Sequence, residues 1–155
     1  MGETALQSYT LLALRIMIGI VFLAHGSQKL FGWFGGFGIN GTYNYLHTTL
    51  GVPAIFSAAG VVAEFTAGAL LMTGTMTGLG SILVILQMSF AIYLLDGKNG
   101  FFMNYFGQYQ AGREGFEYSA FLIGTAIILL FNGPGKYSVD AVTNLDFVRK
   151  FLGLA

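Results

Sequence analysis

Four long apolar segments dominate the sequence, and their length restricts what the chain can fold into. They cover about residues 10–30, 54–73, 78–95 and 116–131. A helix needs about 20 predominantly apolar residues to cross a hydrocarbon layer of about 30 Å. The sequence therefore predicts an all-α, four-transmembrane-helix bundle in a single membrane domain over residues 1–155. The fourth segment is short and begins near Glu117, which indicates that protein shelters this end or that the bilayer is thin there.

The composition agrees with a membrane domain. Of the 155 residues, 55% are hydrophobic and 9% are charged, whereas ordinary soluble domains carry about 25% charged residues. The formal net charge is zero, so no basic field suggests a nucleic-acid partner. The sequence has no cysteine and therefore supplies no thiolate or iron–sulfur ligand, and we expect no intrinsic cofactor or metal. Because Glu3 replaces a basic n-region and no A-x-A cleavage pattern follows, the first segment is predicted to be a retained span.

The connections between these segments are unequal. Residues 74–77 form a short turn, whereas residues 31–52 and 96–115 form two long connections that lie on the same membrane face. Both are rich in glycine and aromatic residues, which is typical of an interfacial belt or a lid. Because the long connections are on one face, we expect the functional site to lie at this looped face. The first is expected to contain a short helix that ends at Leu50. The basic residues are nearly balanced, with a slight preference for cytoplasmic termini.

The tail, residues 132–155, begins with the turn sequence NGPGKY. Beyond it, Ser138 is expected to cap a short C-terminal amphipathic helix, because apolar residues recur at helical spacing up to the end of the chain. We expect this helix to lie on the membrane surface or to dock on a partner.

Three ionisable residues interrupt the first apolar segment, and one interrupts the second. Arg15, His25 and Lys29 fall within an arc of about 80° on the first helix, so they form one polar stripe. Glu64 lies between two glycines, each one helical turn away, a spacing that lets another helix approach closely. A charge within hydrocarbon costs several kcal/mol unless it is paired or faces a polar cavity. We therefore expect these side chains to face the bundle interior.

The rise of about 1.5 Å per residue separates the polar residues into two layers. The inner layer contains Arg15, Glu64 and Gln87, with an ion pair between the arginine and the carboxylate. The layer toward the looped face contains His25, Lys29, Glu117, Gln28 and Asp96. These residues are candidates for ligand binding. The structural alternatives are an ion pair that fixes helix register, a hydrogen-bonded interior histidine, a snorkelling lysine and a carboxylate that stabilises a helix N-terminus.

Four segments carry a resemblance to a known family. They are LRIMIGIVFLAHGSQKLFGWFGG (14–36), AEFTAGALLMTG (63–74), GFEYSAFLIGTA (115–126) and GPGKYSVD (133–140). In order and spacing the chain resembles the DoxX family of small bacterial membrane proteins over about residues 9–140. The resemblance implies a four-helix bundle in the bacterial inner membrane with cytoplasmic termini. Its HGxxK pattern maps onto His25, Gly26 and Lys29, its second-span carboxylate onto Glu64, and the start of its fourth span onto Glu117 and Tyr118.

The resemblance also implies a function. Members of the family are associated with membrane electron transfer, as subunits named for quinol oxidase or thiosulfate:quinone oxidoreductase, and with complexes that handle thiol and oxidative stress. This chain would then be an accessory subunit of a respiratory or photosynthetic redox complex, without catalytic activity alone. It would dock to larger membrane subunits and shelter a quinone, lipid or pigment near His25 and Glu64.

Three other interpretations remain open. The principal alternative is a small oligomeric transporter or channel with a polar path lined by Arg15, His25, Glu64 and Gln87. The others are a quinone-reducing enzyme and a purely structural scaffold.

Overall fold

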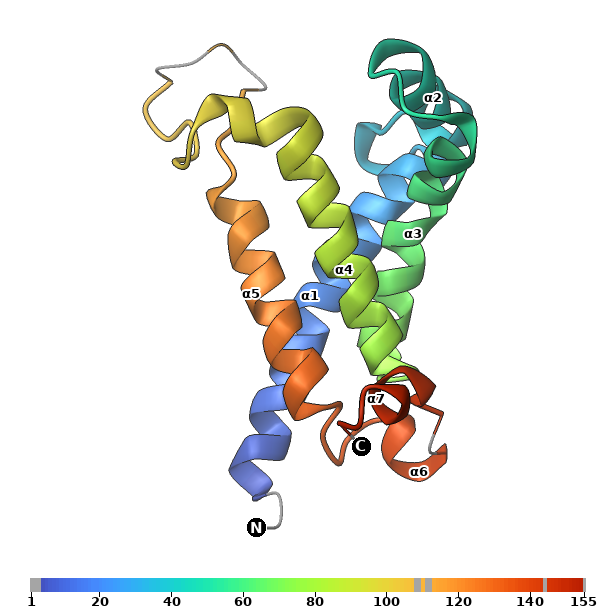
Figure 1. Cartoon of the computed structure of the whole chain (residues 1–155), viewed down its shortest axis with the longest axis vertical. Coiled ribbons are helices and arrows are strands. Elements are labelled where there is room, and N and C mark those ends of the chain that lie inside the picture. The colour runs from blue at the N-terminus through green and yellow to red at the C-terminus, as the bar shows by residue number, and fades with distance from the viewer. Residues whose placement is uncertain (1–3, 108–109, 111–112, 144, 155) are drawn as a thin grey trace.

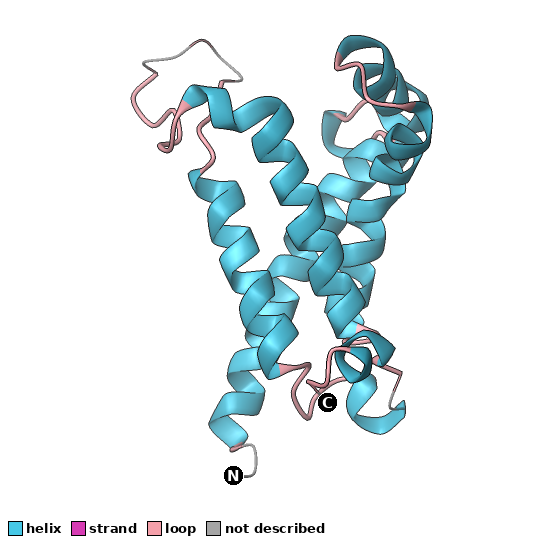
Figure 2. Cartoon of the chain, in the orientation of Figure 1, coloured by secondary structure: helices cyan, strands magenta, loops and turns pink. Residues whose placement is uncertain are grey.

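The computed structural model describes residues 4–107, 110, 113–143 and 145–154, and this part of the chain is helical with no strand. Four long helices cross the molecule, namely α1 (Ala5–Phe31), α3 (Ala54–Thr73), α4 (Thr77–Ala91) and α5 (Glu117–Asn132). The first connection contains η1 (Trp33–Gly35), α2 (Gly38–Asn44) and η2 (Tyr45–Thr49), and α4 continues into η3 (Ile92–Asp96) and η4 (Gly97–Asn99). The tail forms α6 (Asp140–Thr143) and α7 (Phe147–Phe151). The predicted helical membrane bundle is confirmed (Figure 2).

Local sequence signals set the ends of the long helices. Helix α1 begins earlier than predicted, because Thr4 and Gln7 form a reciprocal capping box in which each side chain accepts a hydrogen bond from the other residue's backbone nitrogen. It ends at Gly32, whose φ of 73° is left-handed. Helix α3 covers Ala54–Thr73, as predicted, between the caps Pro53 and Gly74, and Gly74 is also left-handed.

Three helical segments are long and apolar enough to cross a membrane: Ala5–Phe31, Ala54–Thr73 and Thr77–Asn99, the last of which includes the π-helical η3. Helix α5 has 16 residues and is shorter than a typical span. It begins at Glu117, so the expectation of a short fourth helix starting at this carboxylate is confirmed.

The four helices pack as two pairs, α1 with α3 and α4 with α5, and α3 also contacts α4. The pairs separate toward the end that carries the two long connections (Figure 1). Glycines hold α1 against α3: a Cβ on Gly26 would lie 2.4 Å from the backbone nitrogen of Phe65, and one on Gly68 would lie 2.5 Å from that of Leu23. The predicted close approach at Gly68 is confirmed, and it fixes the depth of the α1 side chains relative to α3.

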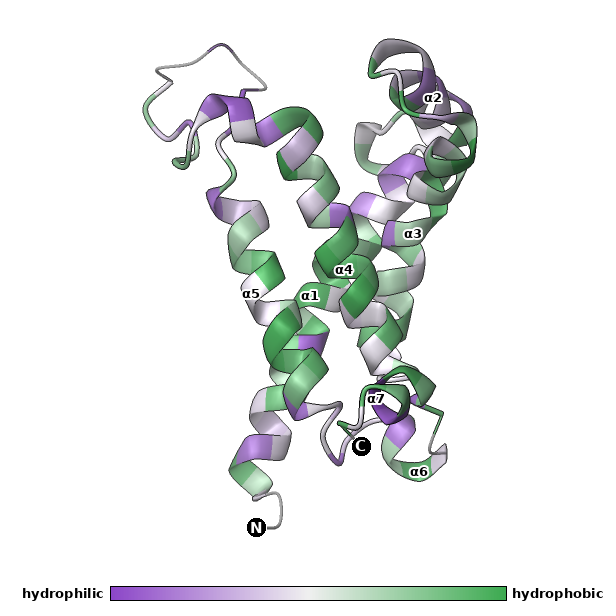
Figure 3. Cartoon of the chain, in the orientation of Figure 1, coloured by the Kyte–Doolittle hydropathy of each residue, from purple (hydrophilic) through white to green (hydrophobic). Residues whose placement is uncertain are grey.

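The outer surface of the bundle is apolar, as a lipid-facing surface should be. Large side chains such as Met17, Ile55, Leu86 and Phe121 are more than half exposed. In each long segment at most a third of the residues in the apolar window are buried within the protein. Figure 3 shows hydrophobic residues along most of the four long helices, interrupted by hydrophilic residues in the upper parts of α1 and α3. The chain is therefore a multi-pass membrane protein.

The two long connections lie at one end of the bundle, as predicted, and the described N-terminal residues and the tail lie at the other (Figure 1). The tail was expected to form a single helix, but it forms two short helices, one on each side of residue 144. Residue 144 itself lies outside the described residues. The Ser138 hydroxyl accepts from the Ala141 nitrogen at 3.1 Å, in agreement with its predicted capping role. A second cap, Asp146, starts α7 by accepting from the Arg149 nitrogen.

Candidate functional site

A partly buried ion pair joins α1 to α3 toward the looped end of the bundle. The Lys29 ammonium lies 2.5 Å from Glu64 Oε1, and the two side chains are 37% and 8% exposed. The other carboxylate oxygen, Oε2, is buried and has no hydrogen-bond partner in the described structure. A buried carboxylate oxygen without a donor is unusual, and it marks Glu64 as a place where a ligand or water would complete the hydrogen bonding.

The predicted partner of Glu64 is wrong, since the carboxylate pairs with Lys29 rather than with Arg15. Helical side chains lean toward the N-terminus of their own helix. Helix α1 runs toward the looped end, so Lys29 leans inward to Glu64, whereas Arg15 leans away from it toward the tail. For the same reason Lys29 does not simply snorkel to the nearer membrane surface, although part of its side chain remains exposed.

Arg15 is fully buried and binds backbone carbonyls at the tail end of the bundle. Its guanidinium donates to Leu71 O at 3.3 Å, in the last turn of α3, and to Tyr137 O. The Tyr137 ring stacks on Tyr9 with centroids 5.0 Å apart, and a hydrogen bond with Tyr9 raises the pKa of Tyr137. Arg15 therefore ties α1, α3 and the tail together, which is a structural role.

Two tail carboxylates, which sequence reasoning missed, satisfy the start of α4. Asp140 accepts from the backbone nitrogens of Met76 and Thr77 at 2.7 and 2.8 Å and from the Thr77 hydroxyl at 2.8 Å. Asp146 accepts from the Gly78 nitrogen at 3.0 Å. These contacts place negative charge at a helix N-terminus, where the helix dipole favours it. Asp140 lies in the GPGKYSVD segment, but nothing local to that segment reveals its partner.

A cavity of about 400 Å³ opens between α3 and α4 beside η2. Its polar lining comes from Lys29, Glu64 and Gln87, and the remaining side chains are apolar. Gln87 Nε2 donates to Gly60 O at 3.2 Å, so it bridges α4 to the backbone of α3. Three exposed residues of the outer surface, Phe56, Leu86 and Phe90, also line the cavity. It therefore opens toward lipid.

A second cavity of about 180 Å³ lies on the α1 and α5 side of Glu64. It is lined by His25, Asp96, Tyr118 and Ser119 as well as by Glu64. The Ser119 hydroxyl donates to Asp96 Oδ2 at 3.1 Å. The imidazole of His25 is exposed and has no hydrogen-bond partner within the described part of the chain. The expected interior, hydrogen-bonded histidine is therefore not what the structure shows.

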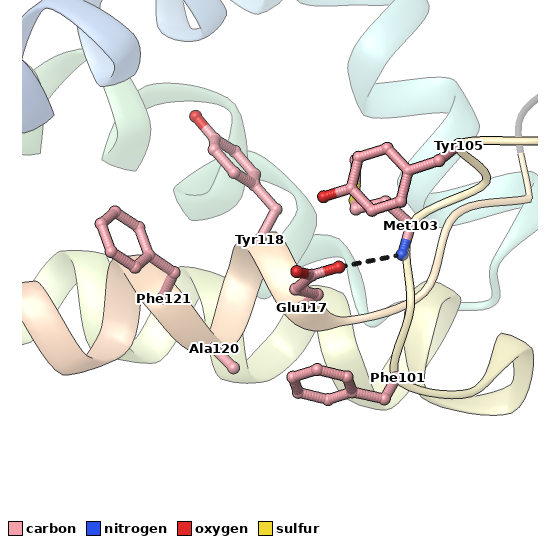
Figure 4. A pocket seen from close by; sticks show the side chains of 7 residues that line it. All are labelled: Phe101, Met103, Tyr105, Glu117, Tyr118, Ala120 and Phe121. Atoms are coloured by element: carbon pink, nitrogen blue, oxygen red, sulfur yellow. Dashed lines mark hydrogen bonds between the residues drawn. The ribbon is translucent and has the colours of Figure 1, made fainter.

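Glu117 lines a different cavity of about 500 Å³ under the third connection, residues 96–115 (Figure 4). The rings of Phe101, Tyr105 and Tyr118 also line this cavity. The Met103 nitrogen donates to Glu117 Oε2 at 3.3 Å. Desolvation and the neighbouring Glu117 carboxylate raise the pKa of Tyr105. The carboxylate thus holds the connection against the first turn of α5, as its helix-start position suggested.

The predicted layer at the looped face is only partly assembled. Lys29 joins Glu64, and His25 and Asp96 share the smaller cavity, whereas Glu117 contributes to the aromatic cavity instead. Two other polar residues have local roles. Gln28 Nε2 donates to Phe34 O at 3.4 Å, and His47 Nδ1 lies 2.8 Å from Val52 O, within the first connection. Neither role contributes to the ion pair.

Comparisons with known proteins agree with this membrane architecture. Residues 10–97, which contain most of α1, all of α3 and α4, and the Lys29–Glu64 pair, match the family model for DoxX. The chain is 29% identical over 139 residues to the uncharacterized membrane protein Rv3486 of Mycobacterium tuberculosis, a match that covers 84% of this chain and 79% of that relative. No solved structure matches. With more than half of its length matched by the model, the chain belongs to the DoxX family of membrane proteins.

Proposed function

We propose that this protein is an accessory membrane subunit of an electron-transfer or redox complex that shelters a quinone or similar amphiphilic lipid between α3 and α4. The observation that carries the proposal is the apolar cavity of about 400 Å³ that ends at the partly buried Lys29–Glu64 pair. Ligand pockets of this size are usually apolar with a few well-placed polar groups.

The chemistry of the cavity suits an amphiphile. Its apolar walls and its opening among Phe56, Leu86 and Phe90 accept an isoprenoid or acyl tail from the bilayer. At its polar end, the Lys29 ammonium offers donors to a carbonyl oxygen, and Glu64 Oε2 offers an unused acceptor to a hydroxyl. A quinone presents the carbonyl and its reduced form the hydroxyl, so both redox states have a partner at this site.

The looped end offers a surface for docking a larger subunit. Large aromatic side chains are exposed there on both connections, among them Phe34, Phe37, Phe102 and Phe106. Aromatic residues are enriched at protein interfaces as well as in membrane belts. This surface lies at the same end of the bundle as the ion pair, so a docked subunit would stand close to a bound amphiphile.

The transporter alternative has less support. A path from Arg15 to Glu64 would have to pass the segment where α1 and α3 touch at Gly19 and Gly68. Arg15 is also committed to the carbonyls of Leu71 and Tyr137. Flux in liposomes would test this alternative: uptake by the wild-type protein that falls to the rate of empty vesicles in Glu64→Gln would support it.

Purification in mild detergent tests the proposal. We expect larger membrane subunits to co-purify, and solvent extraction followed by mass spectrometry to release a quinone or another amphiphile. Ala63→Phe places a ring in the cavity and should lower the extracted amount, whereas the matched variant Thr66→Phe, on the exposed face of α3, should not. A homogeneous protein without any partner, quinone, lipid or pigment would refute the proposal.

A further inference from the structure

Glu64 stands between two cavities of different character. The large apolar cavity between α3 and α4 lies on one side of Glu64, and the small cavity between α1, α4 and α5 lies on the other. Only 6% of the residue is exposed, and its Oε2 atom has no partner. A single carboxylate therefore separates a space that suits lipid from a space that does not.

Part of the wall of the small cavity is polar and can hold water, and the rest is apolar, with Phe22, Met88 and Leu122 among its lining residues. His25, Asp96, Tyr118 and Ser119 bring an imidazole, a carboxylate and two hydroxyl groups to its surface. Its volume of about 180 Å³ has room for several waters, each of which needs two to four polar partners. A water at the Glu64 end would supply the donor that Oε2 lacks.

The position of His25 connects this cavity to the looped face. Its imidazole is exposed, and it lies one helical turn before Lys29, near the end of α1 that leads into the first connection. Asp96 lies at the equivalent end of the α4 segment, before the third connection. The α1–α3 pair and the α4–α5 pair separate toward this same end (Figure 1). The polar lining thus lies toward the looped end, where the two helix pairs separate.

We infer that the small cavity is a water-filled vestibule through which the aqueous phase at the looped face reaches Glu64, while the large cavity stays dry. The charged and titratable groups around Glu64 are Lys29 and His25 from α1, Asp96 from η3 and Tyr118 from α5. Lys29 holds the carboxylate in place, and the others line the aqueous side. The inference does not depend on which amphiphile, if any, occupies the large cavity.

Cysteine accessibility tests the inference cleanly, because the natural sequence has no cysteine. Single cysteines are placed at Met88 in the vestibule, Ala63 in the large cavity, Phe106 at the looped end and Phe151 in the tail. The full-length protein in liposomes is treated with a charged, membrane-impermeant thiol reagent on one side at a time. Met88→Cys should react from the side on which Phe106→Cys reacts, and Ala63→Cys should react only with uncharged N-ethylmaleimide.

Three results would overturn the inference. The first is that Met88→Cys resists the charged reagent while it reacts with the uncharged one. The second is that Met88→Cys reacts from the side on which Phe151→Cys reacts. The third is that Ala63→Cys reacts with the charged reagent as fast as Met88→Cys does. If Met88→Cys does not fold, Leu122→Cys, which lines the same cavity from α5, replaces it. Gel filtration in detergent distinguishes folded variants from aggregated ones before labelling.

Discussion

Loss of the Lys29 ammonium should destabilise the fold much more than loss of the Glu64 charge. The Glu64 side chain is 8% exposed and cannot turn its carboxylate out of the bundle, whereas Lys29 is 37% exposed and can turn its ammonium outward. In Lys29→Met the carboxylate would remain buried without its counter-charge, which costs free energy. In Glu64→Gln the lysine keeps both an amide acceptor and access to water.

The structure gives the size of this asymmetry. Removing one partner of a buried ion pair typically costs about 3 to 5 kcal/mol, because the other charge is left unpaired. We therefore expect Lys29→Met to lower the free energy of unfolding by about 3 to 4 kcal/mol at pH 7. For Glu64→Gln we expect about 1 kcal/mol, the usual net value of one partly solvated hydrogen bond or ion pair.

Reversible unfolding in mixed dodecylmaltoside–SDS micelles, followed by far-ultraviolet circular dichroism at pH 7, measures these differences. Lys98→Met is the matched control, because Lys98 is exposed in η4, and it should change stability by less than about 0.5 kcal/mol. Equal losses in Lys29→Met and Glu64→Gln would refute the reasoning.

Two further substitutions test the packing that surrounds the pair, by the same unfolding assay. Gly26→Ala forces a Cβ into the backbone of α3 and should lower stability by about 2 kcal/mol, whereas Gly124→Ala, which meets open space, should be neutral or stabilising by up to about 1 kcal/mol. A Gly26→Ala protein as stable as Gly124→Ala would contradict the close approach of α1 and α3. Asp140→Ala removes three hydrogen bonds from the start of α4 and should cost about 3 kcal/mol; Asp140→Asn keeps an acceptor oxygen and should cost less. Equal costs for the two Asp140 variants would argue against the carboxylate as the cap.

The helices could be predicted from the sequence because their signals are local. Apolar length gave the four spans, and Pro53 and Gly74 gave both ends of α3. The early start of α1 was also readable, because Thr4 and Gln7 have the spacing of a capping box. The start was missed because apolar length, rather than the cap, was used to place it.

The contacts of the tail could not be predicted, because they join residues more than 60 positions apart. Asp140 reaches Thr77, and Asp146 reaches Gly78, only after α3 and α4 have folded into a hairpin. Amphipathic spacing indicated a helix in this region, but it carries no information about which carboxylates turn toward a helix N-terminus. The short α6 and α7 follow from these capping contacts rather than from periodicity.

The direction of α1 explains why spacing along the stripe was not enough to assign partners. Residues 15 and 29 lie on one face of the helix, and both cations lean toward its N-terminus. That lean moves the charge of Lys29 inward, where it meets Glu64, and the charge of Arg15 toward the carbonyls at the end of α3. A depth estimate from Cα positions alone places Arg15 closer to Glu64 than its guanidinium can be, because it ignores the length and direction of the side chain. Lys29 follows the depth of Glu64 along α1, so its side chain leans back toward the carboxylate on α3, whereas Arg15 precedes that depth and leans away from it. The two cations are therefore not equivalent candidates for pairing, and the direction of α1 favours the lysine.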